Sequence, residues 1–179
     1  MRKQSSDEIS LIKACTNGDQ KAFKRVYDTH VGTMYSICLR YMNSSHDAQD
    51  TLQEGFIKVF QKITTYAHKG SFEGWMKRIF INTCIEALRK RKLYHSIDEL
   101  NNEPNQFMAL NNQSIDADKL IKLIKKLPHG YRTVFNMYVI DGYSHKEISA
   151  ALNITENTSK SQLFKARKQL QQWLKGWFE

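Results

Sequence analysis

The chain has 179 residues and a formal net charge of +9, with 27 Lys and Arg against 18 Asp and Glu. Hydrophobic residues make up 41%, which is enough for a packed core and too many for a disordered chain. With only 2 prolines and 8 glycines, helices are favoured over an all-β fold with many tight turns. No apolar run reaches the roughly 18 residues of a membrane span, and the first residues are polar where a signal peptide would be apolar. We therefore expect an all-α, cytoplasmic protein.

The first basic block, residues 1–93, holds 16 Lys and Arg against 9 Asp and Glu. Its hydrophobic periodicity predicts four helices, at about 7–16, 20–42, 46–63 and 72–92. Asp19, Ser44 and Ser71 are placed to cap the second, third and fourth of these helices. A loop at 64–70 joins the last two.

The helix predicted at 46–63 has two contrasting faces. Leu52, Phe56 and Val59 belong to an apolar stripe, while Asp47, Asp50 and Glu54 lie on the opposite side. Carboxylates near a helix N-terminus complement the helix dipole, which explains the two aspartates better than Glu54. The carboxylate row is therefore either a solvated face or a docking surface for a basic protein partner.

The loop at 64–70 and the helix after it combine positive charge with aromatic side chains. Such a combination suits the unstacked bases of single-stranded nucleic acid. Basic residues at a helix C-terminus are favourable in any protein, however, and for Trp75 a place in the core is favoured over a base contact. The candidate nucleic-acid residues of this region are Tyr66, His68, Lys69, Trp75, Arg78, Asn82 and Arg89.

The middle stretch, residues 94–117, has 4 acidic residues and no basic residue. It is rich in Asn and Gln and has no helical periodicity, so we predict a flexible acidic linker. Two small helical domains, 1–93 and 118–179, would flank it. Two separate basic modules suit a polyanion that is touched at two places, although a basic face can also be merely solvated.

The second basic block, residues 118–179, holds 11 Lys and Arg against 5 Asp and Glu. One helix opens at Asp116 or Asp118 and ends at Leu127, and another covers 131–140. A capped short helix, 145–152, then precedes a three-residue turn and a long helix at 156–173. This order is the helix-turn-helix pattern. The long helix has an apolar stripe on one side. The opposite side is a basic, hydrogen-bonding ridge formed by Ser161, Phe164, Lys165, Lys168 and Gln172. An ordinary amphipathic helix could also have such a polar face. Because Lys reaches guanine edges and phosphates, and Gln pairs with adenine, this ridge together with the preceding helix and turn favours DNA reading.

These segments resemble an extracytoplasmic-function (ECF) sigma factor, the two-domain class of bacterial transcription initiation factor. Residues 47–56, DAQDTLQEGF, are similar to the family's DAEDLVQE-x-F stretch, and residues 71–82, SFEGWMKRIFIN, to its F-x-x-W-L-x-R-I-A-x-N stretch. Leu127-Pro128 through Phe135 and Gly142 through Ile148 resemble the start of its promoter-reading domain. Residues 158–167, TSKSQLFKAR, resemble its T-V-K-S-R-L-x-R-A-R signature.

The resemblance implies a factor that binds core RNA polymerase, directs it to promoters and helps to melt them. Polymerase binding, on the beta-prime clamp helices, would use Asp47, Asp50, Gln53, Glu54 and Phe56. Melted minus-ten DNA would be held by the seven candidate residues between Tyr66 and Arg89 given above. Duplex minus-thirty-five DNA would be read by Thr158, Lys160, Ser161, Gln162, Phe164, Lys165 and Arg167. The beta flap of the polymerase and an anti-sigma or other recruiting protein are further implied partners. The resemblance implies no membrane insertion, cofactor, metal or catalytic residue in this chain.

The long helix and the turn before it depart from the family pattern. Asn153 replaces the turn glycine, which is a mild change because Asn tolerates the left-handed conformation. Asn157 also replaces a glycine, and Ser159 replaces a valine on the buried face. Gln162 and Lys165 replace arginines, which removes bidentate guanine contacts worth about 1–3 kcal/mol of discrimination each. We therefore predict weak or altered minus-thirty-five specificity, offset by a recruiting partner.

Two other classes of protein are open to test. A stand-alone helix-turn-helix regulator would explain 118–179 but would need neither the carboxylate row nor the basic loop and helix before the linker. An enzyme is disfavoured because the 6 histidines are scattered and no glycine-rich phosphate loop follows a strand. The 3 cysteines are far apart and form no CxxC pair, which argues against a zinc site or a disulfide framework.

Overall fold

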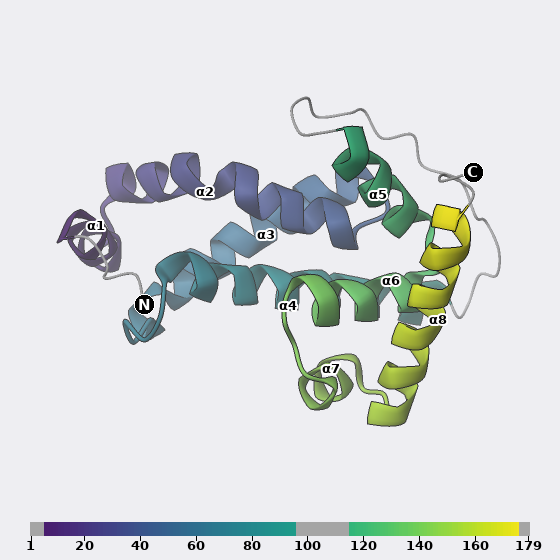
Figure 1. Ribbon diagram of the computed structural model, residues 1–179. Coiled ribbons are helices and arrows are strands. Elements are labelled where there is room, and N and C mark those ends of the chain that lie inside the picture. The colour runs from purple at the N-terminus through teal and green to yellow at the C-terminus, as the bar shows by residue number, and fades with distance from the viewer. Residues whose placement is uncertain (1–5, 96–114, 176–179) are drawn as a thin grey trace. The chain divides into compact units, whose positions relative to one another are not determined.

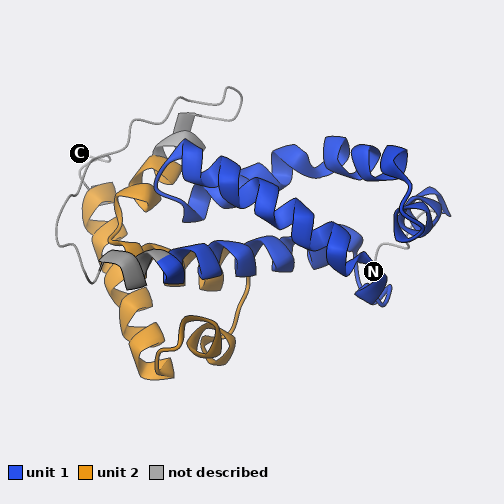
Figure 2. Cartoon of the chain, turned by 180° about the vertical axis from the view of Figure 1, so that it is seen from behind, with its two compact units in different colours: residues 1–105 blue, residues 106–179 orange. Residues whose placement is uncertain are grey.

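The structure is a computed structural model that describes residues 6–95 and 115–175. Both described ranges consist of helices and turns, without a strand, so the predicted all-α class is confirmed. The chain divides into two compact units, residues 1–105 and 106–179 (Figures 1 and 2). Most of the predicted linker, 94–117, lies outside the described residues.

Unit 1 contains the helices α1 (Ser6–Thr16), α2 (Gln20–Tyr41), α3 (Ser45–Lys62) and α4 (Phe72–His95), with a 3-10 turn, η1 (Ile63–Thr65), after α3. The three long helices pack against one another in every pairing, and α1 packs on α2 and η1. Figure 1 shows α2, α3 and α4 lying alongside each other. The helices predicted in this block are therefore confirmed, with α4 ending later than expected.

The predicted caps fix where the long helices of unit 1 begin. The Asp19 carboxylate accepts hydrogen bonds from the Lys21 and Ala22 amides at 2.8 and 3.3 Å. Ser44 Oγ accepts from the Asp47 amide at 3.0 Å, and Ser71 Oγ accepts from the Gly74 amide at 3.0 Å. Each cap satisfies an amide that has no partner inside its helix.

A glycine sets the distance between α3 and α4. A Cβ atom on Gly55 of α3 would overlap the ring of Phe80, which is 0% exposed on α4. Phe80 also meets Phe56 edge-on, with ring centroids 5.1 Å apart. The absence of a side chain at Gly55 therefore lets α4 approach the helix that carries the carboxylate row.

Unit 2 contains α5 (Ile115–Lys126), α6 (His129–Phe135), a π-helical segment η2 (Asn136–Ile140), α7 (His145–Leu152) and α8 (Glu156–Lys175). Helix α8 packs against α5, α6 and α7. Part of its core joins α5 to α8 through Leu123, Ile124, Leu127, Ala166 and Leu170. Unit 2 thus forms around the long helix that the sequence singled out.

The prediction of one regular helix over 131–140 is wrong in detail. Helix α6 begins at His129, directly after Pro128, and the chain then widens into η2. The Asp141 amide donates to the carbonyl of Asn136, five residues earlier, at 2.9 Å. This wider turn leaves the consecutive residues Asn136 and Met137 both buried, at 0% exposure. The turn depends on packing in the core, so the hydrophobic periodicity of the sequence does not reveal it.

The helix-turn-helix is confirmed. Ser144 and Glu147 form the predicted capping box at the start of α7, with the Ser144 amide donating to Glu147 Oε2 at 2.8 Å. Asn153 ends α7 in the left-handed conformation, with φ of 53°. Thr155 Oγ1 then accepts a hydrogen bond from the Thr158 amide at 3.0 Å, which starts α8. No helix in the described part of the chain is both long and apolar enough to cross a membrane.

Candidate functional site

The predicted carboxylate row forms one side of α3. Asp50 and Gln53 are exposed, and Asp47 and Glu54 are partly buried; we call these four residues the acidic face. Asp50 has a long contact with His46 Nε2, at 3.7 Å, and its side chain is 64% exposed. The acidic face therefore presents Asp50 as a well-exposed carboxylate.

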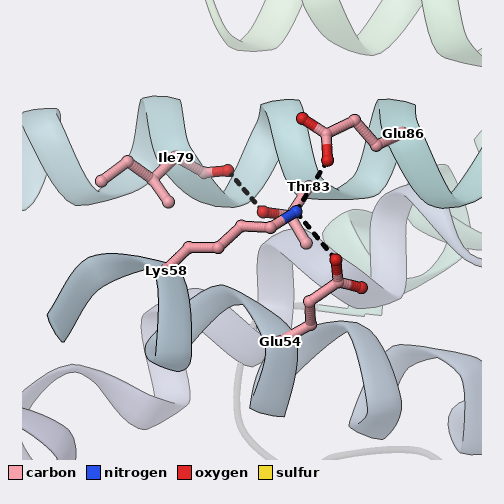
Figure 3. Close-up of polar contacts among 5 residues, drawn as sticks. All are labelled: Glu54, Lys58, Ile79, Thr83 and Glu86. Carbon is pink, nitrogen blue, oxygen red and sulfur yellow. Dashed lines mark hydrogen bonds and ion pairs between the residues drawn. The ribbon is translucent and has the colours of Figure 1, made fainter. Parts of the chain in front are cut away.

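Lys58 ties the acidic face to α4. Its Nζ lies 2.8 Å from Glu54 Oε1 and 2.7 Å from Glu86 Oε2 of α4 (Figure 3). The Lys58 side chain is only 22% exposed. Burial alone would lower the pKa of Lys58, but hydrogen bonds to Glu54 and Glu86 and their negative charges together raise the pKa above its ordinary value. Lys58 is therefore a charged bridge between two carboxylates.

Sequence reasoning missed both Lys58 and Glu86. Lys58 follows Glu54 by four residues, a spacing at which helical side chains meet, so the pair was open to prediction. Glu86 is 28 residues from Lys58 in the sequence, and only the packing of α3 on α4 brings it near. The carboxylates of this region consequently extend beyond α3.

Phe56, which the resemblance assigned to polymerase binding, lies in the core. It is 3% exposed and contacts the ring of Tyr27, with centroids 4.6 Å apart, as well as Phe80. Its neighbour Ile57 is 56% exposed, seven residues after Asp50 and three after Glu54. Phe56 therefore supports the acidic face from beneath, and Ile57 is the apolar side chain exposed beside it.

The loop before α4 is organised by Tyr66. This residue is only 5% exposed, and its hydroxyl donates to the Gly70 carbonyl at 2.8 Å. Its ring lies against Phe72 and Trp75, with centroids 5.2 and 5.3 Å away. His68 takes a φ of 55°, the left-handed region that non-glycine residues rarely adopt. Tyr66, predicted as a base contact, is thus the internal support of the loop.

The other nucleic-acid candidates of this region are more accessible. His68, Lys69, Arg78, Asn82 and Arg89 are all exposed, whereas Trp75 is partly buried. Trp75 stacks on Phe72 with an interplanar angle of 18° and centroids 5.5 Å apart. The structure thus places an aromatic cluster and the exposed side chains of His68, Lys69 and Arg78 in the loop and the first two turns of α4, while Asn82 and Arg89 lie further along the helix. We call the accessible residues, His68, Lys69, Trp75, Arg78, Asn82 and Arg89, the loop–α4 surface.

The candidate DNA-reading residues are distributed around the exposed side of α8. Ser161 and Phe164 are exposed, Phe164 at 67%, and so is Lys168 one turn further on, which was not among the assigned residues. Gln162 is partly buried, and its amide lies over Gly130 of α6, where a Cβ would come within 3.3 Å of Oε1. The amide and the hydroxyl of Thr158 both contact Thr155 Oγ1 at the start of the helix, at 3.0 and 2.8 Å. Ser161, Phe164 and Lys168 are thus the exposed residues on successive turns of this candidate face.

Two cations of α8 are held over tyrosine rings. Lys165 Nζ lies 6.0 Å from the ring centroid of Tyr131, and Arg167 Cζ lies 5.8 Å from that of Tyr138. Lys160, Lys165 and Arg167 are exposed, as predicted DNA contacts must be. Ser159, by contrast, is 0% exposed, so its predicted place on the buried side is confirmed. Its Oγ lies 2.9 Å from Nδ1 of His145 on α7, a partner that the sequence did not reveal.

Metal-ligating side chains do not gather in the described part of the chain. No group of three or more His, Cys, Asp or Glu in 6–95 or 115–175 is arranged to hold a metal ion. Cys15, Cys38 and Cys84 are buried free thiols. The features that stand out in the described residues are the acidic face, the loop–α4 surface and the helix-turn-helix.

A helical unit with an acidic and a basic surface, followed by a helix-turn-helix unit, is the architecture of a two-part transcription factor. Comparison with known proteins agrees in both units. Residues 26–94 match the family Sigma-70 region 2, and residues 117–170 match the family Sigma-70, region 4.

Full-length relatives narrow this class. The chain is 32% identical over 177 residues to the ECF RNA polymerase sigma factor SigW of Bacillus subtilis, covering 92% of this chain and 95% of that protein. It is 26% identical over 185 residues to the ECF RNA polymerase sigma-E factor of Escherichia coli K12, covering 94% of each. The chain belongs to the ECF sigma factors, which direct RNA polymerase to promoters. The match of unit 1 to a sigma-factor domain excludes a stand-alone helix-turn-helix regulator.

Solved structures share the fold. The sigma factor RpoE of Bartonella quintana, in complex with the anti-sigma factor NepR, superposes with a TM-score of 0.62 at 20% identity, covering 87% of this chain and 98% of that one. CnrH, in complex with the cytosolic domain of CnrY, gives a TM-score of 0.52 at 19% identity, covering 93% of this chain and 96% of that one.

Proposed function

We propose that this chain joins core RNA polymerase to promoters through three surfaces: the acidic face of α3, the loop–α4 surface and the exposed side of α8. The observation that carries the proposal is the acidic face, a concentration of carboxylates on a chain with a net charge of +9. A protein that only binds DNA gains nothing from such a face, because it repels phosphate. A factor that must also bind a protein benefits from an acidic face, because the carboxylates attract a basic partner.

The acidic face would dock on the beta-prime clamp helices of the polymerase. Carboxylates attract and orient a basic partner, while a central apolar side chain supplies contact area from which water is excluded. Asp50, Glu54 and Ile57 offer this combination on adjacent turns of α3. Lys58 and Phe56 would act indirectly, by fixing Glu54 and by supporting the helix from the core.

The loop–α4 surface would hold the melted minus-ten strand. Tyr66 and Phe72 build a stable base beneath Trp75, so that the exposed part of the indole offers a stacking surface for a base. Arg78 and Arg89 would then neutralise the phosphates along the strand. The loop is preformed by the Tyr66 hydroxyl bond to Gly70, which reduces the ordering cost of binding.

Helix α8 would read the minus-thirty-five duplex. Ser161 and Lys168 offer hydrogen bonds to base edges and phosphates, and Phe164 offers the apolar surface that suits a thymine methyl group. Because Gln162 lies over Gly130, it is less available to the groove than the sequence suggested. This arrangement supports modest minus-thirty-five specificity, to which contacts with the beta flap and a recruiting protein would add.

We further propose that a regulatory protein binds this chain. Both solved relatives described above were determined in complexes, one of them with a protein named as an anti-sigma factor. The chain itself would carry out no bond-making chemistry and would act in the cytoplasm, where polymerase and promoters are. Its work would be done by binding energy alone.

Reconstitution with core polymerase tests the proposal. The wild-type chain should bind core enzyme and start transcripts at defined sites that core enzyme alone does not use. Asp50→Lys should weaken core binding about tenfold or more, because like charges across an interface repel. Asp28→Lys on α2 is the matched control, since Asp28 is 55% exposed and lies outside the acidic face. A wild-type chain that ignores core enzyme, or two variants that lose equally, would overturn the proposal.

A further inference from the structure

Tyr138 connects the two helices of the helix-turn-helix. Its ring stacks on the imidazole of His145, the first residue of α7, with centroids 4.5 Å apart and an interplanar angle of 23°. The guanidinium carbon of Arg167, on α8, lies 5.8 Å from the same ring centroid. Tyr138 belongs to neither helix, so one side chain of η2 contacts both.

A second contact closes the connection. His145 Nδ1 lies 2.9 Å from Oγ of Ser159, which is completely buried on α8. Ser159 directly precedes Lys160 and Ser161, two of the candidate DNA-reading residues. The imidazole of His145 is therefore fixed on one side by the tyrosine ring and on the other by α8.

The π-helical turn explains why Tyr138 can reach these partners. Hydrogen bonds from the Asp141 amide to the Asn136 carbonyl and from the Tyr143 amide to the Met137 carbonyl, both 2.9 Å, hold the widened turn. The turn buries Met137 and leaves Tyr138 36% exposed. Short π-helical turns are rare in proteins, and those that occur are often found at functional sites. Here the turn presents an aromatic ring at the edge of the DNA-reading unit.

We propose that Tyr138 is a positioning residue for promoter recognition: it holds Arg167 over its ring and keeps α7 in register with α8. A guanidinium is planar and stacks on an aromatic face, so its freedom is reduced before DNA arrives. The inference rests on the proposed function of α8 as the reader of duplex promoter DNA. Tyr138 itself would act through Arg167 and His145 and need not touch DNA.

The experiment uses full-length chain bound to core polymerase. Two fluorescent duplexes serve as probes: a promoter located by mapping the transcript starts of the reconstituted enzyme, and the same duplex with its upstream element scrambled. The measured quantity is the discrimination ratio, the dissociation constant of the scrambled duplex divided by that of the promoter duplex. Tyr138→Phe keeps the ring, Tyr138→Leu and Tyr138→Met remove it, and Val139→Ala is a matched change on the same turn, where Val139 is 46% exposed.

We expect Tyr138→Leu and Tyr138→Met to reduce the ratio about two- to fivefold, the effect of one cation–π pair at an exposed site. Tyr138→Phe and Val139→Ala should leave the ratio unchanged. In a cycle with Arg167→Met, the double variant should lose less than the product of the two single-variant losses, because the contact between Tyr138 and Arg167 is part of both. A role confined to stability would lower the melting temperature and the active fraction but would not change the ratio.

The results separate the two proposals. A wild-type chain that binds both duplexes equally would overturn the assignment of α8 as a promoter reader. If the wild-type chain discriminates but the ring-removing variants discriminate equally well, the role of Tyr138 is wrong while the proposed function stands. Losses that multiply in the cycle with Arg167→Met would also contradict the inference.

Discussion

The packing of α4 against Gly55 of α3 gives a prediction in which the same substitution, glycine to alanine, has opposite effects on stability at two positions. Gly55 lies within α3 against the buried ring of Phe80, whereas Gly32 lies within α2 with nothing within 4 Å of the position its Cβ would take. Replacing glycine by alanine inside a helix normally stabilises it by about 1 kcal/mol, because the unfolded chain has less freedom to lose. We expect that gain at Gly32 alone.

At Gly55 the added methyl group must displace the ring. Phe80 is 0% exposed and is also in contact with Phe56, so it has little room to move. Overpacking of this kind costs about 1–3 kcal/mol and occasionally more. Because a Cβ would overlap three ring atoms of Phe80, the upper part of this range applies. After the propensity gain of about 1 kcal/mol, Gly55→Ala should lower the free energy of unfolding by roughly 2 kcal/mol.

Urea unfolding followed by Trp75 fluorescence measures both variants in unit 1, provided that Trp173 and Trp177 are replaced by Phe in the reference chain. Gly55→Ala combined with Phe80→Leu should recover part of the loss, since the smaller side chain makes room. The reasoning fails if Gly55→Ala stabilises unit 1 as Gly32→Ala does, or if Phe80→Leu adds its full cost on top.

Three further changes test single contacts. Lys58→Met should lower the free energy of unfolding by about 0.5–1 kcal/mol in urea titrations. Because the pKa of Lys58 is raised in the folded chain, its stabilising contribution should be complete below pH 10.5 and should be lost as the pH rises through the higher folded-state pKa. The Lys58→Met variant should not show this loss of stability. Ser159→Val should cost about 1–2 kcal/mol by leaving His145 without its partner, and adding His145→Phe should recover part of it, so strict additivity in a double-mutant cycle would refute the pairing. Asn153→Ala should cost about 1 kcal/mol in the same assay, because its φ of 53° is unfavourable for Ala, while Asn153→Gly should not; equal effects would argue against the left-handed turn.

Local sequence signals predicted the helices because each has a local physical cause. Asp19, Ser44 and Ser144 cap helices through their own neighbours, so the chain announces these starts without help from the rest of the fold. Asn153 likewise tolerates the left-handed turn by itself. The apolar stripes of α3 and α8 identified their buried sides, and the position of Ser159 on the buried side of α8 followed from the same periodicity.

What the sequence could not supply depends on contacts between distant segments. Phe56 and Tyr66 match positions that the family resemblance assigns to binding, yet tertiary packing buries both. Glu86 meets Lys58 only because α3 and α4 are close, and His145 meets Ser159 only across the turn. A motif transfers which residue stands where, but the direction of a side chain is set by its neighbours.

These contacts change the relative weight of the carboxylates in the acidic face. One oxygen of Glu54 is already paired with Lys58. A cation that binds this oxygen must therefore displace the Lys58 ammonium, which is also held by Glu86. Asp50 is 64% exposed and, among the residues that the structure describes, has only the 3.7 Å contact with His46 to lose. Because exchange of one ion pair for another yields little net energy, Asp50 should contribute more than Glu54 to the proposed docking, although both belong to the same sequence motif. The order of importance within the face follows from competition inside the molecule, and charge counting along the helix cannot reveal it.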